Sequence, residues 1–431
     1  MIAFATAQSL LQQAAVLLPS ETVSLNDALG RITAESVRSR ETIPPFANSA
    51  MDGFAVCAAD LEAAATSAVS LPVRGLTAAG EAPATPDGMR GSAWRIMTGA
   101  PLPTSGHTEN YDSIVPIEQV ELLDNGNRIR VVEPVARGQH VRAAGEDFAR
   151  DDEVLAAGIR ITPFHLAALA TTGIGTLAVR RRPQVAHFAT GNELVADASQ
   201  ALQPGQIRNS NSPFLSAVLA QHGAIVRYGG QLRDEAALVA AQLRALIAGK
   251  PGERVSGQTV PDVILTTGAV SAGDFDFVPQ VIRELGGDVI FHKVSIKPGK
   301  PILFAKLPNG SYFFGLPGNP VSTAIGFRFF VLPLLRALQG MPEPAPAWAV
   351  LSGELRKPKA DWRHFLKAQL FVDGDGLLRV RAHSGQESHK IKPLLSSDVW
   401  LVLDEGRSEF HEGVRVPIAG LFDEALPWHY R

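Results

Sequence analysis

The sequence has a single cysteine, Cys57, among 431 residues. One cysteine excludes an intrachain disulfide framework and a cysteine-rich zinc site, and it is typical of a protein in a reducing cytosol. Lys and Arg together number 40 and Asp and Glu 43, so there is no excess of positive charge to indicate nucleic-acid binding. The histidines also show no spacing typical of a zinc site.

Long hydrophobic runs are missing as well. The best candidate, FRFFVLPLLRAL, is interrupted by Arg328 and Arg336, whereas a membrane span needs about 20 apolar residues without charges. The first residues, MIAFATAQSLLQQAAVLLPSE, lack the basic start of an export signal. Their apolar residues recur at helical spacing and predict a surface helix that ends at Pro19. We therefore expect no membrane association and a cytoplasmic location.

Changes in periodicity divide the chain into regions, and its length alone predicts about three domains. Residues 41–139 are rich in Gly, Pro and short β-like runs, among them the hairpin VELLDNGNRIRVV around Asn125-Gly126. ITPFHLAALATTG predicts a helix with Thr162 as N-cap and Gly173 as its stop. We expect this helix to pack beside the N-terminal helix, so that residues 1–40 and 140–178 form a helical linker around an inserted β-rich domain.

Residues 179–340 alternate strands with helices. The strands are QVAHFAT, AIVRYGG, DVILTT and GDVIFHKV, and the helices SPFLSAVLAQHG, DEAALVAAQLRALIAG and DFVPQVIRELGG lie between them. This alternation predicts a doubly wound α/β domain whose sheet is mostly parallel and binds ligands at the carboxyl ends of its strands. Residues 341–431 follow the Pro-rich segment MPEPAPA and return to short strands, which predict a small β-barrel, or a sandwich as the alternative. The fold class is therefore multidomain α/β.

Polar loops follow two of the α/β strands. QVAHFAT runs into GNEL, which places Glu193 just past the end of this strand, and GAVSAGDFDF follows DVILTT. Glycines allow backbone N–H groups to approach an anion, and carboxylates beside a phosphate require a divalent cation such as Mg²⁺. No G-x-G-x-x-G or Walker loop is present. The pattern indicates a metal-assisted nucleotide or phosphoester site, with helix capping by Asp274 as the structural alternative. The residues of interest in this second loop are Gly268, Ser271, Gly273, Asp274 and Asp276.

Two further loops suit an oxyanion. KVSIKPGKPILF carries Lys293, Lys297 and Lys300 on a stretch stiffened by proline, although solvated surface lysines would give the same pattern. FFGLPGNPVSTAIGF joins a buried strand to a helix start with Asn319 as cap and Pro320 at the first position, which is either an anion site or only a well-made helix start. Other acidic residues are equally ambiguous, since Asp234 fits an N-cap or a metal ligand, and Asp52-Gly53 fits a turn.

Taken together, these strings resemble the molybdopterin molybdenumtransferase family, to which the gephyrin E domain belongs. The matching strings are, in order, PPFANSAMDGFAV, MTGAPLP, RAAGEDF, TGNEL, GQIRNSN, TTGAVSAGDFDF, IKPGKP and GLPGNPVS. The resemblance implies an elongated homodimer in which 1–40 and 140–178 also serve dimerisation. It further implies an active site between the α/β and C-terminal domains of one subunit and the β-rich domain of the other.

The activity implied by this resemblance is Mg²⁺-dependent insertion of molybdate into adenylylated molybdopterin, which releases AMP and molybdenum cofactor. A molybdopterin adenylyltransferase and molybdoenzyme acceptors are the implied partners. Glu193, Asp274 and Asp276 would hold Mg²⁺. The implied acidic catalytic set is Asp52, Asp147, Glu193, Asp234 and Asp276. The implied substrate-binding set is Thr98, Gly268, Ser271, Lys293, Lys297, Lys300, Pro317, Gly318, Asn319, Pro320, Arg363 and Ser388.

Several departures from the family pattern occur in the sequence, and three of them change a polar or charged side chain. Ala47 and Phe54 stand where Asp and Tyr are frequent, and Lys367 stands near a usual arginine, which would replace a bidentate fork with a point charge at the molybdate. Two alternative functions remain. A molybdopterin adenylyltransferase usually needs only the α/β domain, and a non-catalytic cofactor carrier or scaffold would have no use for several like charges in one cleft.

Overall fold

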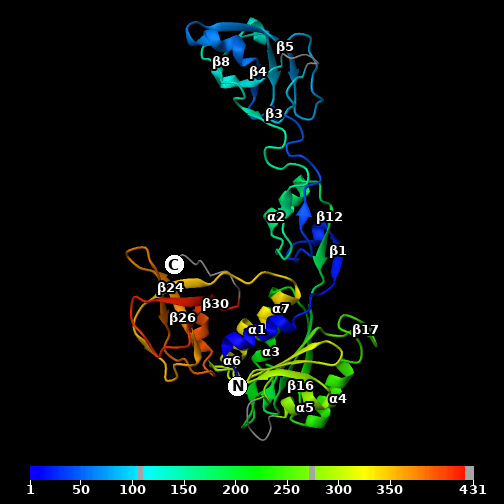
Figure 1. Ribbon diagram of the computed structural model, residues 1–431, viewed down its shortest axis with the longest axis vertical. Helices are drawn as coiled ribbons and strands as arrows, with labels where there is room; N and C mark the ends of the chain where they lie inside the picture. Colours follow the sequence, from blue (N-terminus) through cyan, green and yellow to red (C-terminus); the bar gives the residue numbers. More distant parts are fainter. Residues whose placement is uncertain (105–109, 271–276, 423–431) are drawn as a thin grey trace.

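A computed structural model describes residues 1–104, 110–270 and 277–422 of the chain. The molecule is elongated, with a β-rich sheet at one end, a narrow connecting region in the middle, and an α/β domain beside a β-barrel at the other end (Figure 1). This arrangement confirms the multidomain α/β fold class.

The β-rich sheet has the strand order β7-β4-β6-β5-β9-β8. Its strands are β4 (Gly53–Val56), β5 (Val69–Thr77), β6 (Ala93–Ile96), β7 (Ser113–Pro116), β8 (Val120–Leu123) and β9 (Arg128–Val131). Strands β8 and β9 form the expected hairpin, and the turn takes positive φ angles at Asp124, Asn125 and Gly126. Phe54 is 1% exposed within the core of this sheet, so the position where the family often has Tyr serves packing here.

The connecting region contains helix α2 (Pro163–Thr171) and two small sheets, β1 (Ser20–Ser24) with β12 (Thr176–Arg180) and β2 (Val37–Arg38) with β11 (Glu153–Leu155). Helix α2 begins as expected, with Thr162 and His165 forming a reciprocal capping box and Pro163 at the first turn. Four further two-stranded sheets lie outside the connecting region's two sheets and the three larger sheets. They are β3 (Asn48–Ser49) with β10 (Val141–Arg142), β14 (Leu194–Val195) with β15 (Ile207–Arg208), β17 (Arg254–Val255) with β18 (Gln258–Thr259), and β25 (Leu355–Arg356) with β29 (Glu409–Phe410).

The N-terminal helix has a different partner from the one its sequence suggested. Helix α1 (Phe4–Ala14) lies against α7 (Leu332–Leu338) of the α/β domain, not against α2 (Figure 1). Phe4, Ala7 and Leu11 form its buried stripe and belong to the main α/β core. Amphipathicity predicts that a helix needs an apolar surface but does not specify which one, and the aromatic-rich α/β core is the surface that covers this stripe.

The α/β domain is built on a sheet of order β16-β13-β19-β23-β22-β20. Strands β13, β16, β19 and β23 run parallel, whereas β22 and β20 pair antiparallel at one edge. Helices cover both faces, as the alternating pattern predicted. The strands are β13 (Gln184–Thr190), β16 (Ile225–Leu232), β19 (Val263–Thr267), β20 (Asp288–His292), β22 (Leu303–Lys306) and β23 (Tyr312–Leu316), and the remaining helices are α3 (Asn211–Gln221), α4 (Ala236–Leu246), α5 (Val278–Glu284) and α6 (Pro320–Gly326).

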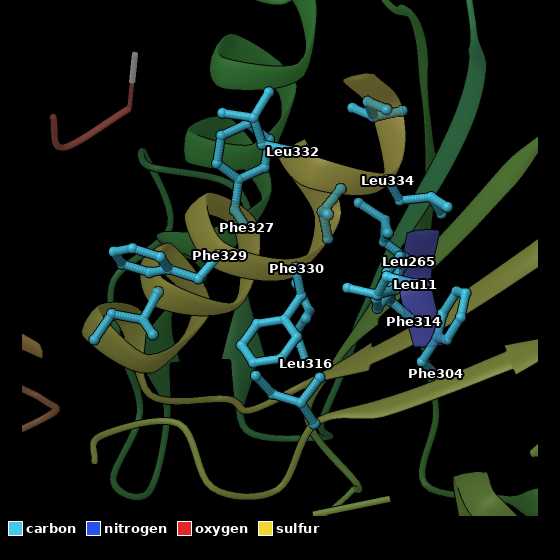
Figure 2. Packing of buried hydrophobic residues seen from close by; sticks show 14 of the residues in the cluster. Leu11, Leu265, Phe304, Phe314, Leu316, Phe327, Phe329, Phe330, Leu332 and Leu334 are labelled. Carbon is cyan, nitrogen blue, oxygen red and sulfur yellow. The ribbon is translucent and has the colours of Figure 1, made fainter. Parts of the chain in front are cut away.

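Helices α6 and α7 join through a π-helical stretch (Phe327–Val331) into one continuous helix, Pro320–Leu338. This helix is long and apolar enough to cross a membrane, yet 83% of its most apolar window is buried inside the protein. Figure 2 shows why: Phe327, Phe330 and Leu332 enter the same core as the sheet residues Phe304 and Phe314. Its position is that of a core helix.

The C-terminal region forms a closed five-stranded barrel, because β26 pairs with both β27 and β28. Its strands are β24 (Ala347–Leu351), β26 (Arg363–Val372), β27 (Leu378–Ala382), β28 (Val399–Leu403) and β30 (Arg415–Gly420). The short strand β21 (Ile296–Lys297) of the α/β domain adds to β26, and Phe365 and Trp400 of the barrel join the main α/β core. The barrel and the α/β domain are thus packed together.

Candidate active site

A cavity of about 480 Å³ lies at the carboxyl ends of the parallel strands. This is the edge where ligands bind in open α/β sheets. Five of the predicted site residues contribute to the wall, although they come from separate segments of the chain: Glu193, Asp234, Gly268, Gly318 and Asn319. The other lining residues are Thr190, Gly191, Leu194, Ile207, Asn211, Thr267 and Ala269.

The loop after β13 carries Glu193 and is tied to the loop after β16. Gly191 has φ +140°, and a Cβ there would lie 2.5 Å from the Glu193 carboxylate, so only glycine leaves room for that side chain. The Asn192 N–H donates to Oδ2 of Asp234 over 3.1 Å, and the Gln231 amide donates to the Gly191 carbonyl. The two carboxylate-bearing loops are therefore held side by side.

Asp234 does not cap helix α4, contrary to the capping role that its position favoured. The residue preceding α4 is Glu235, and its side chain makes no capping hydrogen bond. The carboxylate of Asp234 instead accepts from the backbone of the neighbouring loop at Asn192. Asp234 thus accepts a hydrogen bond from the N–H of Asn192 in another loop and not from the first turn of α4. This contact holds Asp234 at the wall of the cavity.

The loop after β19 reaches the cavity through Gly268. This residue has φ +99°, and a Cβ would lie 2.7 Å from the carbonyl oxygen of Thr190. Its N–H donates to the Leu316 carbonyl over 2.9 Å, which ties the loop to the end of β23. The predicted residues Ser271, Asp274 and Asp276 lie outside the residues that the structure describes.

The start of helix α6 is a junction of three segments. The Asn211 amide donates to the Gly318 carbonyl over 2.8 Å, and Asn319 donates from its amide to Ser388 Oγ of the barrel over 2.9 Å. The Val321 N–H donates to the Ser388 carbonyl over 3.1 Å, so this N-terminal N–H of α6 is already occupied. Asn211 was not singled out from sequence, although it lies in the matching string GQIRNSN at the start of α3.

Pro317 and Pro320 flank this junction. The carbonyl of Pro317 accepts from Thr323 Oγ1 over 2.7 Å, which closes the turn between β23 and α6, and Pro320 occupies the first turn of the helix as expected. The asparagine between them does not use its side chain to cap the helix, because its amide is directed to the barrel. The Pro317–Pro320 turn therefore serves as a link between domains.

The lysine-bearing loop lies against the same helix start. A Cβ on Gly299 would come within 3.6 Å of the Ser322 carbonyl, which places the loop directly beside α6. Lys297 is exposed on β21, and the exposed Lys300 lies 5.7 Å from the centre of the Trp362 ring of the barrel. Lys293 precedes them with φ +72°. Cations thus gather at the seam between the α/β domain and the barrel.

Two cationic residues of the barrel are already engaged. Arg363 forms ion pairs with Asp404 at 3.0 Å and Glu405 at 2.8 Å, so its guanidinium would have to exchange partners to bind an anion. Lys367 is fully buried, and its ammonium donates to three backbone carbonyls. The sequence suggested that Lys367 would present a point charge to molybdate. The structure shows instead that its ammonium is buried and occupied by backbone carbonyls.

The remaining predicted residues belong to the β-rich end of the molecule or its border. Thr98 donates to Oδ1 of Asp52 from its N–H over 2.6 Å and from its hydroxyl over 2.8 Å. These two hydrogen bonds, the backbone one first, lower the pKa of the Asp52 carboxyl. Asp147 is exposed near the connecting region, where its N–H donates to the Ile43 carbonyl. Within one chain, the β-rich sheet and the α/β domain that holds the cavity lie at opposite ends of the molecule (Figure 1).

No cluster of three or more His, Cys, Asp or Glu side chains suited to a metal ion occurs within residues 1–104, 110–270 and 277–422. Two of the three predicted Mg²⁺ ligands, Asp274 and Asp276, fall outside those ranges. The third, Glu193, shares the cavity with Asp234, so two carboxylates supply the hard oxygen donors that Mg²⁺ prefers. The described part of the site is therefore chemically suited to Mg²⁺.

Comparisons with known proteins decide the family. Three family models match in order along the chain: MoeA N-terminal region (domain I and II) over residues 2–173, probable molybdopterin binding domain over 186–337, and MoeA C-terminal region (domain IV) over 349–421. A molybdopterin molybdenumtransferase from Synechococcus elongatus is 36% identical over 94% of this chain and 95% of its own length. The chain belongs to the molybdopterin molybdenumtransferase family.

Other relatives agree with this assignment. The molybdopterin molybdenumtransferase of Haemophilus influenzae is 33% identical over 95% of this chain and 96% of its own length. A crystal structure of a molybdopterin biosynthesis moeA protein from Pyrococcus horikoshii superimposes with a TM-score of 0.79 at 26% identity and covers 97% of this chain and 99% of its own. The similarity to this enzyme family thus extends over nearly the whole length of the chain, from the β-rich end to the barrel.

Proposed function

We propose that this enzyme inserts molybdate into adenylylated molybdopterin in a Mg²⁺-dependent reaction that releases AMP and yields molybdenum cofactor. The observation that carries the proposal is the convergence of Glu193, Asp234, Gly268, Gly318 and Asn319 on one cavity. Relatives that are 33–36% identical over 94–95% of this chain carry the name molybdopterin molybdenumtransferase. Two carboxylates beside glycine-rich turns are what a phosphoanhydride with a bridging cation requires.

We expect the residues on the two sides of the start of α6 to bind different groups. Those on the cavity side would bind Mg²⁺ and the pyrophosphate, and those on the barrel side would bind molybdate. On the cavity side, Glu193 would hold Mg²⁺ together with Asp274 and Asp276, while Asp234 keeps the Glu193 loop in place through the Asn192 N–H. Bound there, Mg²⁺ would neutralise charge on the leaving phosphate. Gly268 and Gly318 have no side chains, so the pyrophosphate could approach the backbone closely at these two positions.

On the barrel side, the exposed Lys297 and Lys300 would attract molybdate, and Ser388 would contribute its hydroxyl. Lys293, Ser271 and the Pro317–Pro320 turn would complete the substrate pocket. Arg363 would take part only by leaving its carboxylate partners Asp404 and Glu405. The molybdenum finally takes dithiolene sulfur from the pterin as its soft ligands, which is consistent with a chain that has a single cysteine.

We further propose that the site is completed by a second subunit. Asp52 and Thr98 lie beside strands β4 and β6 of the β-rich sheet, and Asp147 lies between β10 and β11. The β-rich sheet and the α/β domain that holds the cavity lie at opposite ends of the molecule, so the described part of one chain does not bring Asp52 and Thr98 to Glu193 (Figure 1). A homodimer with two shared sites would do so, because a two-fold partner can place its β-rich end over the cavity. We expect the dimer to act in the cytoplasm, where an adenylyltransferase supplies the substrate and molybdoenzymes accept the product.

The test is AMP release from adenylylated molybdopterin by purified, metal-free protein, with Mg²⁺ and molybdate added separately and together. Molybdenum retained with the pterin is quantified in the same samples. We expect AMP release that depends on Mg²⁺ and is coupled to molybdenum capture. Synthesis of adenylylated molybdopterin from ATP would instead support an adenylyltransferase, and binding without turnover under every condition would support a carrier or scaffold.

A further inference from the structure

Lys367 is a buried cation with every donor in use. It lies on β26 with 0% exposure, and its ammonium donates to the carbonyls of Gly385 over 2.7 Å, Glu387 over 3.2 Å and Lys390 over 3.0 Å. A lysine ammonium has three donors and no acceptor. No N–H is therefore left for a substrate anion, and burial lowers the pKa of this group.

The same residue also holds the loop through its backbone. The Lys367 N–H donates to Oε1 of Gln386 over 3.0 Å, and its carbonyl accepts from Nε2 of Gln386 over 2.9 Å and from the His383 N–H over 2.9 Å. Residues 383–390 are thus wrapped around one lysine, whose ammonium is the donor to three carbonyls of this loop.

Ser388 is the part of this loop that reaches another domain. Its hydroxyl accepts from the Asn319 amide and its carbonyl accepts from the Val321 N–H, both at the start of α6. Asn319 in turn lines the cavity beside Gly318. The contacts form a continuous chain from the buried ammonium, through the loop, to the wall of the cavity.

We propose that Lys367 is a positioning residue, which holds the loop 383–390 so that Ser388 docks on the start of α6 and faces the molybdate side of the site. The proposal rests on the function proposed above, since it gives Ser388 a place in substrate binding. Lys367 itself touches no substrate. A lysine suits this role because three converging carbonyls match its three donors.

The test compares the full-length protein with Lys367→Met, Ser388→Ala and the double variant. Amide hydrogen exchange is followed in the peptides that cover 383–390 and 318–325, and KM for molybdate is separated from kcat. We expect Lys367→Met to speed exchange in both peptides and to raise KM for molybdate by about tenfold, a loss typical of residues that orient a ligand-binding group. The double variant should lose no more than the more affected single variant.

Two further variants serve as controls. Lys357→Met removes another buried barrel lysine, whose ammonium donates to the carbonyls of Ala360, Trp362 and Asp404, and it should leave exchange in 383–390 unchanged. Gln386→Ala loosens the Ser388 loop without removing the buried charge, so it keeps the test available if Lys367→Met does not fold. It should shift the same peptides in the same direction.

Unchanged exchange in 318–325 in Lys367→Met and Gln386→Ala, or losses that simply add in the double variant, would overturn the positioning role. Failure of the proposed function gives a different result. In that case the wild-type protein would show no coupled AMP release and molybdenum capture, whereas the exchange measurements would still decide whether Lys367 holds Ser388 on α6.

Discussion

At the scale of single residues, Asp52 is defined by its partner Thr98, which donates both its N–H and its hydroxyl to the same carboxylate oxygen. These bonds lower the pKa of Asp52 from 3.8, so the group is ionised throughout the neutral range. We expect Asp52→Ala to reduce molybdenum insertion by about a hundredfold or more, in the range of a lost acid–base or charged group. Thr98→Val keeps the backbone bond and should cost about tenfold.

The measurement is the rate of AMP release coupled to molybdenum capture at pH 6 and pH 8. Because the carboxylate is charged at both values, each variant should lose the same factor at both. A Thr98→Val loss that recovers at the higher pH would show that Asp52 titrates between pH 6 and pH 8 in that variant, and this would contradict a carboxylate that is charged at both values.

Because two histidines are buried, we expect the stability of the fold to decrease in acid. Burial lowers the pKa of His187 to about 4, and burial together with Lys297 and Lys357 lowers the pKa of His364 to about 4. The unfolded chain, with a histidine pKa near 6.5, then binds more protons than the folded chain between about pH 4 and 6.5. The free energy of unfolding should therefore fall as the pH drops through this window, by at most about 3 kcal/mol per histidine.

Urea unfolding at pH 7.5 and pH 5 measures this effect. His187→Gln and His364→Gln should each show a smaller drop in the unfolding midpoint than wild type. His411→Gln is the matched control, because His411 is 70% exposed and its replacement should leave the drop unchanged. Equal drops in all four proteins would contradict the assignment of acid sensitivity to the buried rings.

At the scale of elements, the glycine after β19 joins three strand ends. Gly268 and Gly310 have nearly the same φ, +99° and +97°, but a Cβ on Gly268 would meet the Thr190 carbonyl whereas a Cβ on Gly310 would meet nothing within 4 Å. Both alanine variants carry the strain of a positive φ, on the order of 1–3 kcal/mol. We expect Gly268→Ala to be the more destabilising and to lose activity, while Gly310→Ala keeps it.

Thermal unfolding and the coupled assay measure the pair together. Equal activity in the two variants would mean that the approach of the β19 and β13 loops at Gly268 does not shape the site. A lower melting temperature for both proteins, with activity lost in Gly268→Ala alone, is the expected result.

The same elements show what could be predicted from sequence. Local signals sufficed for β13, β19 and α2, because apolar runs, an N-cap residue and a proline in the first turn can be identified from consecutive residues. They did not suffice for Asp234, whose local capping role gave way to a donor from another loop, or for the partner of α1. Lys367 was misread for the same reason, since the carbonyls that surround it come from a loop about twenty residues away.

At the scale of the whole molecule, the barrel and the α/β domain behave as one body while the β-rich sheet stands apart. Phe365 of the barrel stacks on Phe329 with ring centres 4.1 Å apart, and both contact Phe4 of α1. In the described part of the chain, the slender middle region connects the β-rich sheet to this body (Figure 1). An isolated chain therefore keeps Asp52 remote from Glu193, and this separation makes the shared-site proposal open to a decisive test.

A heterodimer of Asp52→Ala and Glu193→Ala subunits performs that test. If each site combines the β-rich end of one subunit with the cavity of the other, one of the two sites receives both changes and the other receives neither. The purified heterodimer should then recover about half of the wild-type activity, although each homodimer is inactive. Differently tagged subunits, exchanged and isolated by both tags, give the required species.

The matched control pairs Glu193→Ala with Asp234→Ala. Both residues line the cavity of the same chain, so every site in this heterodimer carries one change and no recovery is expected. Recovery in this control would mean that Glu193 and Asp234 of one chain do not serve the same site, and it would contradict the assignment of the cavity to a single subunit. An inactive Asp52→Ala/Glu193→Ala heterodimer, with subunit exchange verified, would place the whole site within one chain, and the β-rich end would then have to reach the cavity by moving about the connecting region.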